Sequence, residues 1–362
     1  MARIGIVSRV HGINYGANLQ AFALQKILER LGNDVEYINL EVKNTNKGLR
    51  SILSFGYNCV KYLFGYRKRL KRTLIFRKLI NFSKEVHTQE DLKELDDRYD
   101  VTLCGSDQIW NPRYYTKSNG LYLLNFSKKR KASYASSFGV ETLRKEYSEI
   151  LQSELSTFHS LSSRENTGVA ILERMGLKSE RHIDPTFLLS SNEWIKFANR
   201  RRVIKDPYIC CYIMPGVKGL NNYIVKTADR LLANHPEIKK IIIIGEREYK
   251  KLFSFHNYIT TAGPLEFLSL ISNASIVLTS SFHGTCFSII FNKLFYSILD
   301  RSNKFNSRII DLLSMFNLDN RIRWSDEAFK ITEIAPIQYQ AINDKIGWER
   351  ERALQYLSSI TK

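Results

Sequence analysis

The sequence predicts an α/β protein of two Rossmann-like, doubly wound domains that face each other across a cleft. Its 362 residues are enough for two cores of ordinary size. Short apolar runs alternate with stretches of helical periodicity along most of the chain, which is typical of parallel sheets flanked by helices. A basic stretch over residues 192–202 interrupts the alternation, which then restarts, so we expect one domain on each side of it.

The first domain is predicted to cover residues 1–186. A strand over 3–8 leads into a helix, because apolar residues recur at helical spacing over 19–31. Gly32 ends this helix, and a second strand follows over 34–40. Three further strands are expected, over 99–104, 131–137 and 159–164.

The second domain is predicted to cover residues 187–337, and a helix over 338–362 is expected to pack back on the body of the protein. The strands of the second domain are expected over 208–214, 239–245, 275–280 and 295–299. In open parallel sheets, ligands bind at the carboxyl ends of the strands. The functional residues should therefore follow strands directly and line the cleft.

The positive charge of the chain is concentrated in one segment. Lys and Arg number 54 against 36 Asp and Glu, a formal net charge of +18. Twelve of the basic residues and no acidic one lie between Val42 and Lys84, so residues 43–84 are interpreted as a basic insertion. Apolar and basic residues occupy different helical faces within it, which favours docking on an anionic membrane surface. The residues predicted to face the membrane are Arg67, Arg69, Lys71 and Arg72.

A solvated basic face over an ordinary core-packing stripe explains the same pattern equally well. Nucleic acid is disfavoured as a partner, because the segment lacks the interleaved base-stacking aromatics of single-strand binders.

Several classes of protein are excluded by missing patterns. The five cysteines are scattered, so neither a disulfide framework nor a metal site is predicted. No apolar run approaches membrane-spanning length, and the N-terminus does not resemble a signal peptide. A Walker A lysine motif, a GxSxG elbow and HExxH are all missing. We therefore expect a cytoplasmic protein with free thiols and no metal.

The strongest candidate for chemistry follows the strand over 275–280. Ser281, His283, Gly284 and Thr285 open a helix there, and a helix N-terminus attracts anions. Gly284 and Thr285 are predicted to cradle a phosphate, Ser281 to add a hydroxyl donor, and His283 to exchange protons with the bound group. An ordinary serine N-cap without a ligand is the alternative.

Two further groups follow strands. Arg164 is expected to aim a guanidinium fork into the cleft, toward a carboxylate or phosphate. A surface ion pair with a neighbouring glutamate would also explain this arginine. Asp107, Gln108 and Trp110 form a polar and aromatic group that suits a sugar, although turn chemistry alone would explain much of that segment.

A set of landmarks spans residues 4–315 in a fixed order. They are Asn14-Tyr15-Gly16-Ala17 with residues 19–25, then residues 105–112, Ser163-Arg164-Glu165, Asp184-Pro185-Thr186 and Ser281-Phe282-His283-Gly284. No single landmark is diagnostic, but the ordered set is specific, and it resembles the polysaccharide pyruvyl transferase family.

The resemblance implies a two-domain fold like that of the GT-B glycosyltransferases. It implies transfer of pyruvate from phosphoenolpyruvate onto a sugar as a ketal, with release of phosphate, during assembly of a bacterial surface glycan. Phosphoenolpyruvate is the donor substrate, and no cofactor or metal is implied. The acceptor would be the glycan or a lipid-linked precursor such as an undecaprenyl-linked oligosaccharide, modified at the cytoplasmic face of the plasma membrane.

The resemblance also implies residue roles. His283 would be the acid that protonates the donor, and Asp107 would deprotonate or hold the attacking hydroxyl. Many members have an arginine where this chain has Ser281, so Arg308 or Arg301 is expected to supply that cation. The donor-binding residues would be Arg164, Ser281, Gly284, Thr285 and Arg308. The acceptor-binding residues would be Asn14, Tyr15, Gln20, Gln108 and Trp110.

Two alternatives stay open at this point. A GT-B-type glycosyltransferase with a nucleotide-sugar donor would hold a diphosphate near His283 and a ribose on Asp300 or Asp311. A non-enzymatic protein that binds polyanions or membranes would use the basic segment instead of the cleft.

Overall fold

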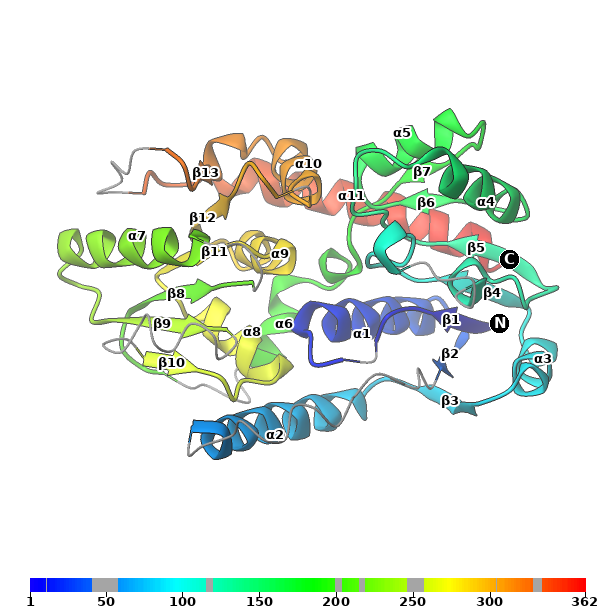
Figure 1. Ribbon diagram of the computed structural model, residues 1–362, viewed down its shortest axis with the longest axis horizontal. Helices are drawn as coiled ribbons and strands as arrows, with labels where there is room; N and C mark the ends of the chain where they lie inside the picture. The colour runs from blue at the N-terminus through cyan, green and yellow to red at the C-terminus, as the bar shows by residue number, and fades with distance from the viewer. Residues whose placement is uncertain are drawn as a thin grey trace.

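The structure consists of two α/β domains side by side, with the C-terminal helix running behind both (Figure 1). It is a computed structural model that describes residues 1–10, 12–40, 58–114, 120–198, 204–214, 219–245, 257–303, 305–327 and 334–362. Residues 43–57 of the predicted basic insertion lie outside these described residues.

The first domain is built on a parallel sheet in the order β3-β2-β1-β4-β5. Its strands are β1 (Arg3–Val7), β2 (Asp34–Leu40), β3 (Phe82–Val86), β4 (Val101–Cys104) and β5 (Arg130–Ser133). Two short strands, β6 (Ser162–Ser163) and β7 (Glu180–Arg181), pair with each other. Backbone hydrogen bonds from Ser133 to Ser160 and from Ser136 to Ser162, of 3.0 and 3.1 Å, attach this pair to the β5 edge.

The basic segment contains the crossover helix between two strands of this sheet and is not an insertion. Helix α2 (Asn58–Arg77) is the crossover that connects β2 to β3, and β3 pairs with β2. Sequence reasoning missed β3 because its strand, FSKEV, is short and carries two exposed charged residues. Such a composition is common for a strand at the edge of a sheet.

Helix α1 (Tyr15–Arg30) of the first domain begins at a side-chain cap and ends before a glycine. Asn14 caps this helix, its side-chain oxygen accepting from the amide of Ala17 at 3.1 Å, and Gly32 follows the helix with a φ of +85°. The other helices are α3 (Gln89–Asp97), α4 (Lys145–Leu155) and α5 (Asn166–Arg174).

The second domain has a six-stranded parallel sheet in the order β10-β9-β8-β11-β12-β13. Its strands are β8 (Tyr208–Tyr212), β9 (Lys240–Ile244), β10 (Asn257–Ile259), β11 (Ile276–Thr279), β12 (Leu294–Leu299) and β13 (Ile322–Trp324). Its helices are α6 (Ser191–Ala198), α7 (Leu220–Asn234), α8 (Pro264–Ser272), α9 (Phe282–Ile290) and α10 (Ser307–Met315). Both sheets thus have the Rossmann strand order, which reverses between β1 and β4 and between β8 and β11.

The two domains share one apolar core. Helices α1, α6 and α8 meet where the domains join (Figure 1), and the ring of Tyr15 stacks on that of Phe267 with centroids 4.8 Å apart. Phe22 of α1 contacts Trp194 of α6 in the same cluster. The domains are therefore held together by buried side chains and not only by a linker.

Helix α11 (Tyr339–Ile360) contacts both domains and lies behind them in the view of Figure 1. The hydroxyl of Tyr339 donates to the carbonyl of Lys293 in the second domain, and that of Tyr356 donates to the carbonyl of Ser133 in the first, at 2.8 Å. Glu349 on the same helix is buried and pairs with Arg181 of β7. The C-terminal helix thus lies across both sheets.

Removal of the buried Tyr356 ring tests whether α11 is packed against the first domain. Tyr356→Ala should lower the free energy of unfolding by about 3–5 kcal/mol, because it leaves a cavity against His182 and Tyr134. Gln355→Ala, at the exposed neighbouring position, should change it by no more than about 0.5 kcal/mol. Urea denaturation compares the two variants, and an equal effect of both would contradict a packed helix.

Candidate active site

A cavity of about 610 Å³ lies between the switch points of the two sheets. It is lined by residues that follow β1, β4, β8 and β11, together with the start of α10 and one side chain from α2. This is the location that the carboxyl ends of parallel strands favour for a ligand. Four arginines line it, namely Arg9, Arg69, Arg113 and Arg308. Among the cavity-lining residues that the structure describes, Asp107 is the only carboxylate.

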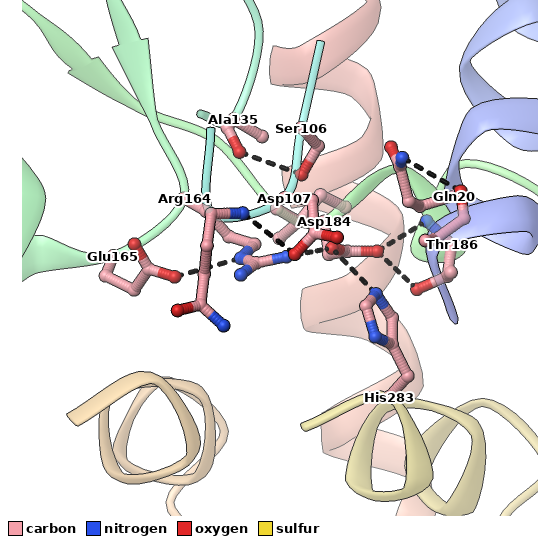
Figure 2. A network of polar contacts seen from close by, with 12 residues as sticks. Gln20, Ser106, Asp107, Ala135, Arg164, Glu165, Asp184, Thr186 and His283 are labelled. Carbon is pink, nitrogen blue, oxygen red and sulfur yellow. Dashed lines mark hydrogen bonds and ion pairs between the residues drawn. The ribbon is translucent and has the colours of Figure 1, made fainter. Parts of the chain in front are cut away.

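His283 lies in the cavity wall at the N-terminus of α9. Ser281 caps this helix, its hydroxyl accepting from the amide of Gly284 at 3.3 Å. The imidazole is 7% exposed, and its Nε2 faces a carboxylate oxygen of Asp184 at 3.6 Å (Figure 2). A Cβ added to Gly16 would overlap the ring of His283, so the glycine at the start of α1 makes room for this side chain.

Asp184 is a buried carboxylate that joins several groups (Figure 2). Its Oδ1 accepts from the amide and hydroxyl of Thr186, at 2.9 and 2.7 Å, and so caps the short helix η4 (Pro185–Phe187). Its Oδ2 accepts from the guanidinium of Arg164 at 2.7 Å. Burial alone would raise the pKa of Asp184, but hydrogen bonding and attraction to His283 and the charge of Arg164 hold it below its ordinary value.

Arg164 does not point into the cavity, which corrects the sequence-based expectation. It is 3% exposed, donates to Glu165 at 2.9 Å as well as to Asp184, and stacks on the ring of Phe282 at 4.1 Å. Burial opposes its charge, yet the pKa of Arg164 is raised by Glu165 and Asp184. The pairing with a neighbouring glutamate, weighed as an alternative, is present, but it is buried and not on the surface.

Arg308 supplies a cation to the cavity from the first turn of α10. When the amide of Gln108 is oriented with its oxygen toward Arg308, that oxygen accepts from both terminal nitrogens of the guanidinium, at 2.9 and 3.1 Å. Arg301, the other predicted substitute, lies instead in exposed ion pairs with Asp326 and Glu327.

Arg69 supplies a second cation, which sequence reasoning placed at a membrane surface. The side chain is buried, donates to the carbonyl of Ile13 at 3.2 Å and stacks over the ring of Tyr15 at 4.6 Å. Arg72 is also turned inward, donating to the carbonyl of Thr261 and pairing with Glu266. The run of basic residues in the sequence did not show which arginines of α2 face the protein interior and which face solvent.

Asp107 lies in the cavity with a φ of +83°, in the left-handed region that a non-glycine residue rarely adopts. Its side chain accepts from the amide of Gln108 at 2.8 Å. Asn14, Tyr15 and Gln108 line the same cavity. These four predicted acceptor-side residues are thus brought together in the same cavity.

Gly284 and Thr285 do not line the cavity, contrary to the prediction of a phosphate cradle. A Cβ on Gly284 would overlap the side chain of Thr279, so this glycine serves close packing. The hydroxyl of Thr285 is hydrogen-bonded to that of Ser297 at 2.7 Å. Ser281 does line the cavity, although its oxygen is occupied in capping the helix.

Gln20 and Trp110 are also buried away from the cavity, which corrects their predicted role in acceptor binding. The amide of Gln20 donates to the carbonyl of Ala17 within α1. The indole of Trp110 packs against Phe138 and Phe158 in the core of the first domain.

The acidic residues considered for a ribose lie outside the cavity. Asp311 accepts from the amide and hydroxyl of Thr167 at 3.1 and 3.2 Å, a contact between α10 and α5. Asp300 accepts from Ser302 and Ser325. Neither lines the main cavity.

Within the described part of the chain, no cluster of three metal-ligating side chains occurs, and no helix combines the length and hydropathy needed to cross a membrane. Cys104, Cys210, Cys211 and Cys286 are buried free thiols.

The family profile of the polysaccharide pyruvyl transferases matches residues 14–302, about four-fifths of the chain. The chain belongs to this family. The match covers His283, Asp184 and the cavity-lining residues from Asn14 to Phe282, whereas Arg9, Gly12 and Ile13 precede it and residues 303–309 follow it. The chain is thus a transferase that acts in polysaccharide modification. It has no significant match among curated proteins.

Solved structures confirm the fold of this pyruvyl transferase family member. The UDP-GlcNAc 2-epimerase of Methanocaldococcus jannaschii is 15% identical with a TM-score of 0.53, covering 97% of this chain and 92% of that one. The UDP-GlcNAc 2-epimerase of Neisseria meningitidis, bound to UDP-GlcNAc, is 11% identical with a TM-score of 0.52, covering 100% and 94%. A UDP complex of S. aureus MnaA is 12% identical with a TM-score of 0.53, covering 99% and 91%. At such identities the likeness shows a GT-B-type fold.

The buried charge of Asp184 makes stability depend on pH. Asp184→Asn keeps an acceptor for the η4 cap but leaves Arg164 short of a counter-charge, which should cost about 3–5 kcal/mol at neutral pH. Because the folded-state pKa of Asp184 is lowered, its contribution is complete above the unfolded-state value of about 3.9 and is lost as the pH falls through the folded-state value.

The difference in unfolding free energy between wild type and Asp184→Asn should therefore shrink as the pH is lowered from about 4 to 2. Urea unfolding at a series of pH values measures it. Asp97→Asn, at an exposed position on α3, should leave the profile unchanged. Parallel profiles for wild type and Asp184→Asn would contradict the assignment.

Proposed function

We propose that the protein transfers pyruvate from phosphoenolpyruvate to two hydroxyls of a sugar, forming a ketal and releasing inorganic phosphate. The observation that carries this proposal is the placement of His283, backed by the Asp184 carboxylate, in the wall of an arginine-lined cavity. Phosphoenolpyruvate bears a carboxylate and a phosphate, so a site with four arginines and one carboxylate complements its charge. Membership in the family supports the same reaction.

Arg308 and Arg69 are the cations we assign to the donor. Arg308 stands near the ring of Phe282, 5.7 Å from its centroid, which places it close to the N-terminus of α9. Arg69 lines the same cavity from α2 and donates to the carbonyl of Ile13. These two arginines would replace the arginine that many members carry at the position of Ser281. Arg164 acts behind Phe282, holding Asp184 in its ionised form.

The chemical step begins with proton donation by His283 to the methylene carbon of phosphoenolpyruvate. The Asp184 carboxylate stabilises the positive charge of the imidazolium and holds the ring in place. The central carbon then gains oxocarbenium character, and the arginines stabilise the phosphate and carboxylate that flank it.

The sugar is assigned to Asn14, Tyr15, Asp107 and Gln108, of which Tyr15 and Gln108 also contact the donor cations Arg69 and Arg308, so that donor and acceptor would lie next to each other. One hydroxyl oxygen attacks the central carbon and gives its proton to Asp107. The phosphate leaves with the electron pair of its bond to carbon, and the second hydroxyl attacks the same carbon and loses its proton. One of the two hydroxyl protons balances that given to the methyl group, and the other leaves with phosphate or solvent.

We propose a bacterial surface glycan, or its lipid-linked precursor, as the acceptor, modified in the cytoplasm at the inner face of the membrane. The test is incubation with phosphoenolpyruvate and a lipid-linked or nitrophenyl galactoside. Phosphate release together with a pyruvyl mass gain on the sugar is expected. Consumption of a nucleotide sugar alone would contradict the proposal.

Removal of the proposed acid should lower turnover. His283→Ala should reduce kcat by about 10²–10⁴-fold, with a smaller change in KM, because proton donation matters most in the transition state. His235→Ala is the matched control, since His235 lies at the end of α7, outside the cavity. Steady-state phosphate release measures both variants, and equal kcat values for the two would refute the role of His283.

Removal of the proposed donor cations should weaken donor binding. Arg308→Ala and Arg69→Ala should each raise the KM for phosphoenolpyruvate by about 10- to 100-fold, the range for loss of a charged hydrogen bond. Arg301→Ala removes the same charge from an exposed site that pairs with Asp326 and Glu327, so it should leave KM within about twofold. A KM change shared by all three variants would indicate a general effect of net charge.

A further inference from the structure

Helix α2 and the turn after it have two faces of different character. Arg69, Arg72 and Arg77 point inward, toward the cavity wall, α8 and the loop before α1. The side chains on the opposite side are exposed. We call these the α2 outer face, which comprises Arg67, Lys68, Lys71, Leu74, Ile75, Lys78 and Leu79.

The spacing of the α2 outer face is that of one helical surface. Positions 67, 71, 74 and 75 recur at the intervals that place residues on the same side of a helix, and Lys78 and Leu79 lie in the turn directly after it. Of the seven side chains of the α2 outer face, four are basic and three are apolar. Leu74 and Ile75 are 47% and 46% exposed in the middle of this surface.

Exposed apolar side chains are concentrated here. Of the seven large hydrophobic residues that are exposed in the described part of the chain, four lie on α2 or the turn after it. They are Tyr66, Leu74, Ile75 and Leu79. A solvated helix whose only task is to cover a core has no need of apolar side chains on its outer side.

We propose that the α2 outer face docks on an anionic phospholipid surface. Its four cations attract anionic headgroups, while Leu74, Ile75 and Leu79 reach the acyl boundary between them. No acidic residue lies between Val42 and Lys84, so the attraction is not offset within the helix. The long basic side chains can place their charges at headgroup level while their stems lie beside the apolar ones.

Because α2 lies beside the cavity, docking of this helix would also fix where the cavity lies relative to the bilayer. The helix contacts the second domain through Arg72 and Thr261, and the first through Arg77 and Asn18. Figure 1 shows it below α8 of the second domain and α1 of the first. Arg69 lies in the cavity wall on its inner side. Docking would thus hold the cavity beside the bilayer, which suits a lipid-carried acceptor; this last step rests on the proposed function.

The test is co-sedimentation of the full-length protein with vesicles. We expect binding to phosphatidylcholine vesicles with about a third phosphatidylglycerol at about 0.1 M salt, and none to pure phosphatidylcholine. A variant with Arg67, Lys68, Lys71 and Lys78 all changed to Gln should partition at least about tenfold less. The control changes Lys93, Lys178, Lys205 and Lys226, exposed on other surfaces, to Gln and should stay within about twofold of wild type.

A second variant, Leu74→Ser with Ile75→Ser and Leu79→Ser, tests the apolar part of the surface. It should lose the binding that persists when salt is raised to about 0.5 M. Circular dichroism confirms that each variant is folded.

The proposal is overturned if wild type does not sediment with anionic vesicles, or if the control variant loses binding as far as the α2 variant. Binding of single-stranded RNA that depends on the α2 outer face, without vesicle binding, would also overturn it. Turnover of a water-soluble galactoside should be the same in wild type and the α2 variants, because none of these residues lines the cavity. Vesicle binding without any pyruvyl transfer would refute the proposed function and leave the docking surface standing.

Discussion

The burial of one carboxylate, that of Asp184, is the constraint on which the site depends. A charge removed from water is costly unless it is paired and hydrogen-bonded, and Asp184 meets this condition with Arg164, Thr186 and the nearby His283. These partners come from the end of β6, from η4 and from α9 of the other domain. The carboxylate therefore ties the first domain to the second at the point where the proposed proton donor stands.

The residues where the two domains meet also determine how much space the His283 imidazole has. Gly16 at the start of α1 leaves room for the imidazole, and Tyr15 beside it stacks on Phe267 of the second domain. The shared apolar core and the α11 helix keep these elements in contact. A proton donor that is built from two domains needs such a rigid joint, because small displacements at a reacting centre cost much of the rate.

Much of the fold was predictable from the sequence, whereas only part of the site was. Strand and helix periodicity predicted two parallel sheets, but β3 was missed because a short edge strand with charged residues does not alternate clearly. The positions of His283 and Asp107 in the cavity follow from the rule that ligands bind after parallel strands, whereas Arg308 was predicted only as the substitute for an arginine expected at Ser281. Arg69 was misplaced because a run of basic residues on a helix does not reveal which side is buried.

Gly284 and Trp110 were misinterpreted because close packing selects the same residue types as ligand binding. The signal for Asp184 was present as an aspartate before Pro-Thr, an N-cap pattern, but its role depends on contacts from distant segments.

The central claim is that this cavity protonates the methylene carbon of phosphoenolpyruvate as pyruvate passes to the sugar. The most direct measurement is the reaction carried out in D₂O, followed by mass spectrometry and proton NMR of the ketal methyl group. The account predicts one deuterium per methyl group together with stoichiometric phosphate release. Phosphate release with a methylene carbon that takes up no deuterium, or a sugar product without a ketal, would contradict it.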